Sequence, residues 1–156
     1  DIPVNRNVEI EGSTLNLGDY QIVPNAQSTT KFSNLTLTGN NKKGIIASQN
    51  VATVELNNVK HTGADLVNAK ALNVIVSGHT ASTVTTANNR IALNSESNIY
   101  YANLEIAKDS TLTIKRNDGL QGDLVHLSDN GKVELKDNAT FNATLNGQRR
   151  DAAVRV

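Results

Sequence analysis

The chain lacks three residue types altogether. Its 156 residues include no Cys, no Met and no Trp, and the only aromatic side chains are three Tyr and two Phe. The absence of cysteine excludes disulfides and thiolate metal sites. Large globular cores normally use aromatic side chains, which bury much area per residue. The apolar residues here are Val, Ile, Leu and Ala, so we expect a thin, layered core that small aliphatic side chains can fill.

An excess of either charge is also lacking, since 15 Lys and Arg balance 15 Asp and Glu. Nucleic-acid binding needs a concentrated positive field, so no nucleic-acid partner is expected. No apolar run approaches the length of a membrane span, and we expect no membrane insertion. No signal peptide is recognisable, and the sequence starts at Asp1 without Met. We therefore interpret residues 1–156 as one domain excised from a larger protein.

Short runs in which apolar and polar residues alternate recur from end to end. Such pairs of apolar residues are Val8 and Ile10, Leu35 and Leu37, Val54 and Leu56, Leu104 and Ile106, Leu112 and Ile114, and Val133 and Leu135. Gly, Asn, Asp or Ser bounds each run, as turns require. No segment has a convincing helical period. The sequence therefore predicts an all-β fold.

Weak internal repeats decide between a β-sandwich and a β-solenoid. The segments starting at Asn34, Asn58 and Asn73 resemble one another, and Leu104–Thr113 resembles Val133–Asn142. The unequal spacing of these repeats favours an irregular parallel β-helix of roughly six to seven coils over a strict short-repeat solenoid. In such a stack, Asn34, Asn58 and Asn73 are expected to form a ladder of amides, each bonding the next coil. A β-sandwich with Asn-rich hairpins is the alternative.

The segments Ile2–Gly12, Thr14–Gly18, Phe32–Asn40 and Thr53–Gly63 resemble the pectate-lyase-like adhesive domain of Gram-positive bacterial surface proteins. The resemblance covers nearly the whole chain. It implies a right-handed parallel β-helix, displayed extracellularly at the cell surface or cell wall. The implied role is adhesion to a host or environmental glycan or to a matrix protein. The family's binding surfaces vary, so no binding residue is carried over.

Catalytic motifs are not recognisable. The acids Asp109, Asp118, Asp123, Asp129 and Asp137 fall mostly in turns. We expect no pair of carboxylates at i, i+2 on one strand face, which calcium-dependent or acid–base chemistry on a β-helix would require. The histidines His61, His79 and His126 are isolated, so we place them on the surface or in turns and predict no metal site. Thr-x-Thr triplets such as Thr36–Thr38 reflect strand propensity and are not expected to form rows on one face.

The candidate ligand-binding residues are Tyr100, Lys42 and Lys43. An outward Tyr100 ring offers a flat surface for stacking on a sugar, and the two lysines suit acidic sugars. The chain is thus predicted to be a non-enzymatic adhesion module without a cofactor, monomeric as an isolated domain. Two alternatives stay open, a polysaccharide-active lyase or hydrolase with an unrecognised site, and a structural spacer.

Overall fold

The computed structural model describes residues 1–25, 27–41, 43–48, 51–69, 72–85, 103–116, 124–127, 131–144 and 153–155. All regular structure in these ranges is β-strand, which confirms the all-β prediction. Every ladder between described strands is parallel. No described segment is a helix long and apolar enough to cross a membrane.

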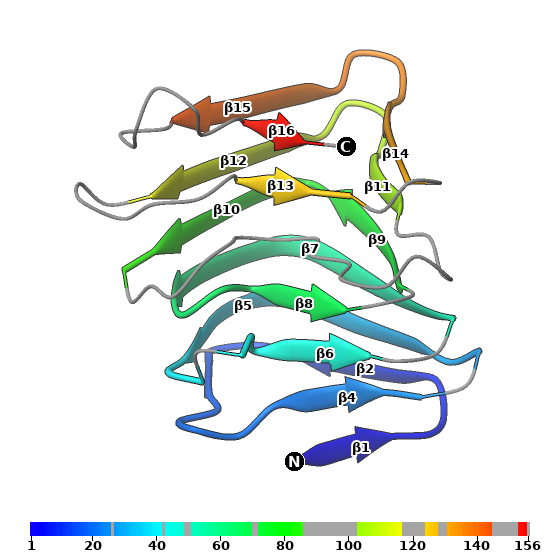
Figure 1. Cartoon of the computed structure of the whole chain (residues 1–156). Helices are drawn as coiled ribbons and strands as arrows, with labels where there is room; N and C mark the ends of the chain where they lie inside the picture. Colours follow the sequence, from blue (N-terminus) through cyan, green and yellow to red (C-terminus); the bar gives the residue numbers. More distant parts are fainter. Residues whose placement is uncertain are drawn as a thin grey trace.

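The strands follow one another in sets that stack from the N-terminus to the C-terminus (Figure 1). We call each set a rung. The rungs are, in order, β1 Ile2–Val4, β2 Val8–Glu11 and β3 Thr14–Asn16; β4 Ile22–Pro24 and β5 Thr29–Gly39; β6 Ile46–Ser48 and β7 Ala52–Gly63; β8 Val67–Ala69, β9 Leu72–Ser77 and β10 His79–Val84; β11 Asn103–Ile106 and β12 Thr111–Arg116; β13 Val125–His126, β14 Lys132–Leu135 and β15 Thr140–Thr144. The last strand, β16 Val154–Arg155, pairs with β13.

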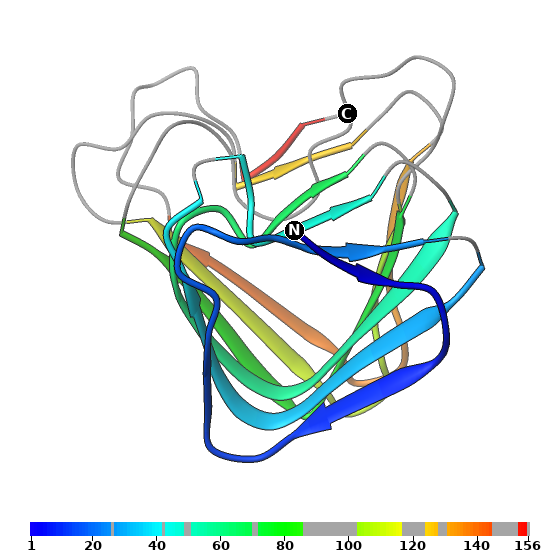
Figure 2. The same ribbon diagram turned by 90° about the horizontal axis from the view of Figure 1, so that it is seen from below.

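Each rung contributes to two broad faces that meet at a corner. The first face consists of β2, residues 29–33 of β5, residues 52–57 of β7, β9, β11 and β14; the second face consists of β3, residues 35–39 of β5, residues 59–63 of β7, β10, β12 and β15. Seen along the stack, the two faces form a V that the short strands of the smaller sheets close (Figure 2). The long strands β5 and β7 run around the corner without interruption.

The corner depends on residues in the left-handed backbone region. Asn34 and Asn58 have φ values of 53° and 52°, a conformation that asparagine tolerates better than most side chains. Asn58 Nδ2 donates to Asn34 Oδ1 at 3.2 Å, and the His79 N–H donates to Asn58 Oδ1 at 2.8 Å. A Cβ on Gly78 would collide with Asn58 Oδ1, so a side chain at position 78 would displace the Asn58 amide. The amide ladder predicted for Asn34 and Asn58 is therefore confirmed.

The prediction that Asn73 is the third member of this ladder is wrong. Asn73 pairs in register with Thr53 on the first face, not with the corner residue Asn58. The fourth rung turns the corner with Gly78. Asn73 does bond to an amide of the next rung, because Asn103 Nδ2 donates to Asn73 Oδ1 at 3.0 Å.

Inward side chains stack in columns that run along the molecule. Behind the first face, one column consists of Phe32, Leu56, Val76 and Ile106, each at most 1% exposed. Burying one such side chain contributes about 1.5–3 kcal/mol. These columns leave the alternate, outward side chains free to differ between the two faces.

Candidate ligand-binding groove

The outward residues of the first face form polar columns across neighbouring strands. The ladder register places Thr53, Asn73, Asn103 and Lys132 side by side in successive rungs. Two residues further along each strand, the column is Glu55, Ile75, Glu105 and Glu134. The parallel pairing therefore gathers amides, carboxylates and a lysine from segments far apart in the sequence.

A hollow of about 250 Å³ lies over these columns. Its lining includes Thr53, Asn73, Ile75, Asn103, Glu105, Lys132 and Glu134. A second hollow, of about 350 Å³, lies on the same face towards the N-terminal rung and is lined by Asn7, Val8, Glu9, Thr29, Lys31 and Glu55. Glu55 and Thr53 lie on the same strand, so the two hollows follow each other along the face. We call this strip the groove.

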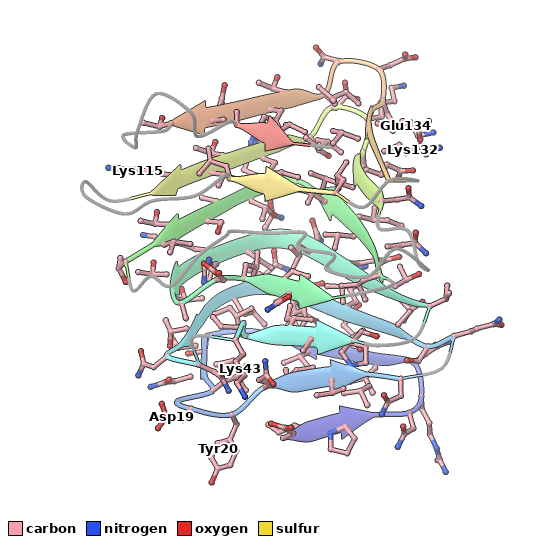
Figure 3. The ribbon with its side chains drawn as sticks, in the orientation of Figure 1. Asp19, Tyr20, Lys43, Lys115, Lys132 and Glu134 are labelled. Carbon is pink, nitrogen blue, oxygen red and sulfur yellow. The ribbon has the colours of Figure 1, made fainter. Side chains whose placement is uncertain are left out.

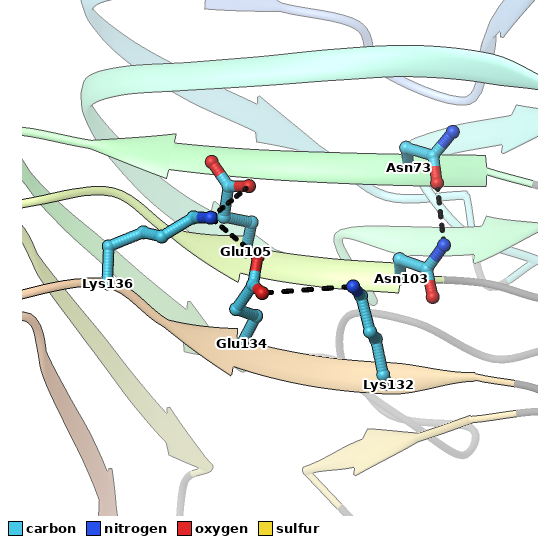
Figure 4. A network of polar contacts seen from close by, with 6 residues as sticks. All are labelled: Asn73, Asn103, Glu105, Lys132, Glu134 and Lys136. Atoms are coloured by element: carbon cyan, nitrogen blue, oxygen red, sulfur yellow. Dashed lines mark hydrogen bonds and ion pairs between the residues drawn. The ribbon is translucent and has the colours of Figure 1, made fainter.

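Two lysines and two glutamates form an ion-pair network at one end of the groove (Figure 4). Lys136 Nζ lies 2.9 Å from Glu134 and 3.9 Å from Glu105. Lys132 Nζ lies 3.8 Å from Glu134 on the same strand. Lys136 therefore bridges the carboxylates of two adjacent rungs, which removes the repulsion expected between like charges side by side.

The network fixes the protonation states. The hydrogen bond from Lys136, together with the charges of Lys132 and Lys136, holds the pKa of Glu134 below its ordinary value. The hydrogen bond to Glu134 and its charge in turn raise the pKa of Lys136. Both groups are charged at neutral pH, and Glu134 is poorly suited to donate a proton.

Amide groups line the neighbouring column. Asn103 donates to Asn73, which leaves the Asn73 Nδ2 donor and the Asn103 Oδ1 acceptor without a partner among the described residues. Ile75 adds an aliphatic surface next to them. Hydroxyl groups of a sugar are both donors and acceptors, and a sugar ring also has apolar C–H faces, so this mixture matches a carbohydrate. Among the described residues, no group of three or more His, Asp or Glu side chains is placed to hold a metal ion.

The expectation that no two carboxylates stand at i, i+2 on one strand face is wrong. Glu9 and Glu11 stand at i, i+2 on β2, and both side chains are exposed. Glu9 forms an ion pair with Lys31 on the next rung at 3.5 Å. The alternation of the strand places both carboxylates outward on the first face, and this spacing was visible in the sequence.

The sequence-based candidates are not part of this groove. Tyr100 and Lys42 lie outside the described residues. Lys43 is exposed in the loop between β5 and β6, far from Lys132 and Glu134 (Figure 3). Its backbone N–H donates to Asn41 Oδ1 at 2.9 Å, and Asn41 Nδ2 donates to the Asp19 carbonyl at 2.9 Å. The structure thus places Lys43 beside the loop of the preceding rung.

That preceding loop contains an exposed aromatic ring, Tyr20, which is not among the residues predicted to bind a ligand. Tyr20 is 63% exposed, whereas the two phenylalanines are buried or partly buried. The Gly18–Asp19 turn immediately before Tyr20 was the available signal, since such turns lie at the surface.

The expected position of the histidines is wrong for His61, which is 1% exposed and stacks in an inward column between Leu37 and Ser82. Its Nε2 lies 2.8 Å from the Ala64 carbonyl, and its Nδ1 lies 2.7 Å from Ser82 Oγ. A carbonyl can only accept, so Nε2 carries the proton and Nδ1 accepts from the serine hydroxyl. Burial lowers the pKa of His61 to about 4, despite the opposing hydrogen bond to Ala64.

His79 is exposed on the next rung, so the two histidines do not form a shared site. Of His126, only the backbone within β13 is described.

Comparisons with known proteins identify no relative. Protein-family models, curated proteins and solved structures were searched, and none of them matches the chain.

Proposed function

We propose that the chain is a right-handed parallel β-helix of six to seven coils that serves as an adhesion module of a Gram-positive bacterial surface protein. In this proposal, the module lies outside the cell, at the surface or wall, and binds a glycan or a matrix protein without cleaving it. The groove on the first face is the binding site.

The fold part of the proposal is supported by the strand register. Each strand pairs in parallel with the equivalent strand of the next rung, and the inward columns continue through several rungs. Parallel strands need long crossover connections, and here the two other sides of each coil supply them.

The binding part rests mainly on the groove. Its polar columns cross six strands, from β2 to β14, which corresponds to about 20–25 Å at the usual strand spacing. Such a strip can hold several consecutive units of an extended polymer. Amide groups, carboxylates, a lysine and the aliphatic Ile75 lie side by side within it. Of the two ligand classes, a glycan therefore suits the groove better than a matrix protein.

The electrostatics favour binding over hydrolysis. A glycosidase needs one carboxylic acid with a raised pKa as proton donor. In the groove, lysines hold the pKa of Glu134 low, which is the opposite shift. Carboxylates paired in this way are suited to accepting hydrogen bonds from sugar hydroxyls.

The test is a glycan array combined with a screen of matrix proteins, followed by binding measurements on two variants. Asn103→Ala removes a groove amide and is expected to weaken binding at least tenfold. Thr113→Ala, an equally small change on the second face, is expected to leave the affinity unchanged. Equal effects of the two variants would exclude the groove as the site.

The same preparation is incubated with uronate polymers, and reducing ends and unsaturated products are measured. We expect neither product. Cleavage would establish the polysaccharide-active alternative, and a chain that binds no ligand in either screen would favour the structural spacer.

A further inference from the structure

The charged side chains that line the groove are paired with one another, with one exception. In one hollow, Lys31 Nζ lies 3.5 Å from Glu9. In the other hollow, the lysines of the ion-pair network occupy Glu105 and Glu134 (Figure 4). Glu55 lies between these two groups, and it forms no hydrogen bond or ion pair with any described residue. The middle of the groove therefore contains an unpaired carboxylate.

The register explains why Glu55 has no partner. Lys31 stands between Glu9 on β2 and Glu55 on β7, and it forms its ion pair with Glu9. The hollow around Lys31 is thus lined by two carboxylates and a single lysine. At the far end of the groove, two lysines balance two carboxylates. One negative charge remains uncompensated on the groove, and it is localised at Glu55.

The neighbour of Glu55 on its other side is the aliphatic Ile75. Ile75 can neither neutralise the carboxylate nor donate a hydrogen bond to it. Adjacent strands are about 4.8 Å apart, which is close to the length of one hexose unit in an extended chain. When the C–H face of one sugar ring packs on Ile75, a substituent of the next ring therefore lies at Glu55.

The charge at this position discriminates between sugar substituents. An ammonium group gains a charge-assisted hydrogen bond to the carboxylate, which is stronger than the bond that a neutral hydroxyl or acetamide can form. The carboxylate of a uronate would meet a like charge, which disfavours its binding. Among these substituents, the free amine fits Glu55 best.

We infer that the groove selects glycans that contain free amino groups, such as hexosamine polymers without N-acetyl groups, and that Glu55 is the residue that determines this specificity. The inference rests on the proposed function of the groove and names the class of sugar that it binds.

The experiment measures the affinity for two glucosamine oligomers of equal length by calorimetry, one fully N-acetylated and the other without acetyl groups. A slightly acidic buffer keeps the amines charged. Glu55→Gln removes the unpaired charge and keeps the size of the side chain. Glu11→Gln is the matched control, because Glu11 is exposed on the same face but lines neither hollow.

We expect the unmodified chain and Glu11→Gln to bind the amino oligomer more tightly than the acetylated one, by about threefold to tenfold. Glu55→Gln is expected to bind the two oligomers equally, and its remaining affinity for the acetylated oligomer shows that the variant is folded. Lys31→Gln leaves Glu9 uncompensated as well, so the preference for the amino oligomer is expected to increase.

Three results would overturn the inference. These are equal affinities for the two oligomers in the unmodified chain, a preference that survives in Glu55→Gln, and a lysine peptide of equal charge that binds as tightly as the amino oligomer. If glycans of the array bind at the groove without such a preference, this inference fails and the proposed function stands. If no glycan binds, both fail.

Discussion

The two faces share a backbone and a register but differ in their outward chemistry. The first face carries the carboxylates Glu9, Glu55, Glu105 and Glu134 in one column with Lys31 and Ile75. The outward residues of the second face are mostly threonines, with Lys60 and Lys115, and none of the described ones is a carboxylate. The Thr38, Thr62 and Thr83 side chains form one column there. The Thr-x-Thr triplets themselves do not stack, because Lys60 lies beside Thr36 and Ala81 lies beside Thr113.

The faces also differ on their inner sides. Phe32 and Leu56 stack behind the first face, whereas the His61–Ser82 pair lies behind the second face. The comparison indicates that the inward columns maintain the stack and the outward columns determine what each face can bind. Because inward and outward residues alternate, one set can change without the other.

The largest effect is expected for Phe32→Ala, which empties the core column behind the first face. Phe32 is fully buried, so its truncation leaves a cavity and is expected to lower the free energy of unfolding by about 3–5 kcal/mol. Urea denaturation followed by circular dichroism measures this. The matched outward change on the second face, Thr38→Ala, is expected to cost less than about 0.5 kcal/mol. Similar costs for both would mean that the inward column does not maintain the stack.

Acid is expected to destabilise the molecule through the second face. Burial lowers the pKa of His61 to about 4 in the folded chain, whereas the ordinary value of 6.5 applies to the unfolded chain. Between these two pH values the unfolded chain binds more protons, so the free energy of unfolding falls as the pH is lowered, by about 3 kcal/mol in total. Urea denaturation at a series of pH values measures the slope. In His61→Leu this part of the slope is expected to disappear, and an unchanged slope would show that His61 is not buried as a neutral side chain.

The corner between the faces is expected to tolerate no side chain at Gly78. In Gly78→Ala, the new methyl collides with Asn58 Oδ1, and an L-residue is held at a φ of 63°. We expect a loss of about 1–2 kcal/mol from the backbone alone, and more from the broken amide ladder. Gly12→Ala, where the space is open, is the control for the backbone contribution. Thermal unfolding of both variants compares them, and a smaller loss at Gly78 than at Gly12 would contradict the ladder.

A smaller effect is expected in the ion-pair network of the first face. Lys136→Met removes the hydrogen bond and one charge that lower the pKa of Glu134, so this pKa is expected to rise towards its ordinary value. NMR titration of the Glu134 side chain reports the change. Lys115→Met on the second face is expected to leave the titration unchanged, and the comparison fails if both variants shift it equally.

Much of the fold follows from local alternation in the sequence. Apolar residues at every second position, such as Val54 and Leu56 or Leu104 and Ile106, are correctly predicted to face inward. The same alternation predicts that His61 faces inward. When Asn58–Gly63 is aligned with Asn34–Gly39, His61 occupies the position of the buried Leu37, and the register confirms this pairing.

The register between rungs was harder to predict, since it depends on turns of unequal length. The spacing of Asn58 and Asn73 suggested a shared column, but the fourth rung turns its corner with Gly78 and moves Asn73 onto the first face. The pairing of Glu105 with Glu134 followed from the repeat Leu104–Thr113 with Val133–Asn142. The groove itself was not predicted. Its columns depend on the registers of all five strand pairings of the first face, and the sequence indicated only some of these.

The most direct test of the difference between the two faces is an NMR titration of the labelled chain with a glycan selected from the array. We predict that the shifted amides cluster on the first face, around Asn73, Asn103 and Glu134, and that amides around Thr62 and Thr83 do not move. Shifts centred on the second face, or spread evenly over both faces, would contradict the assignment of binding to the groove.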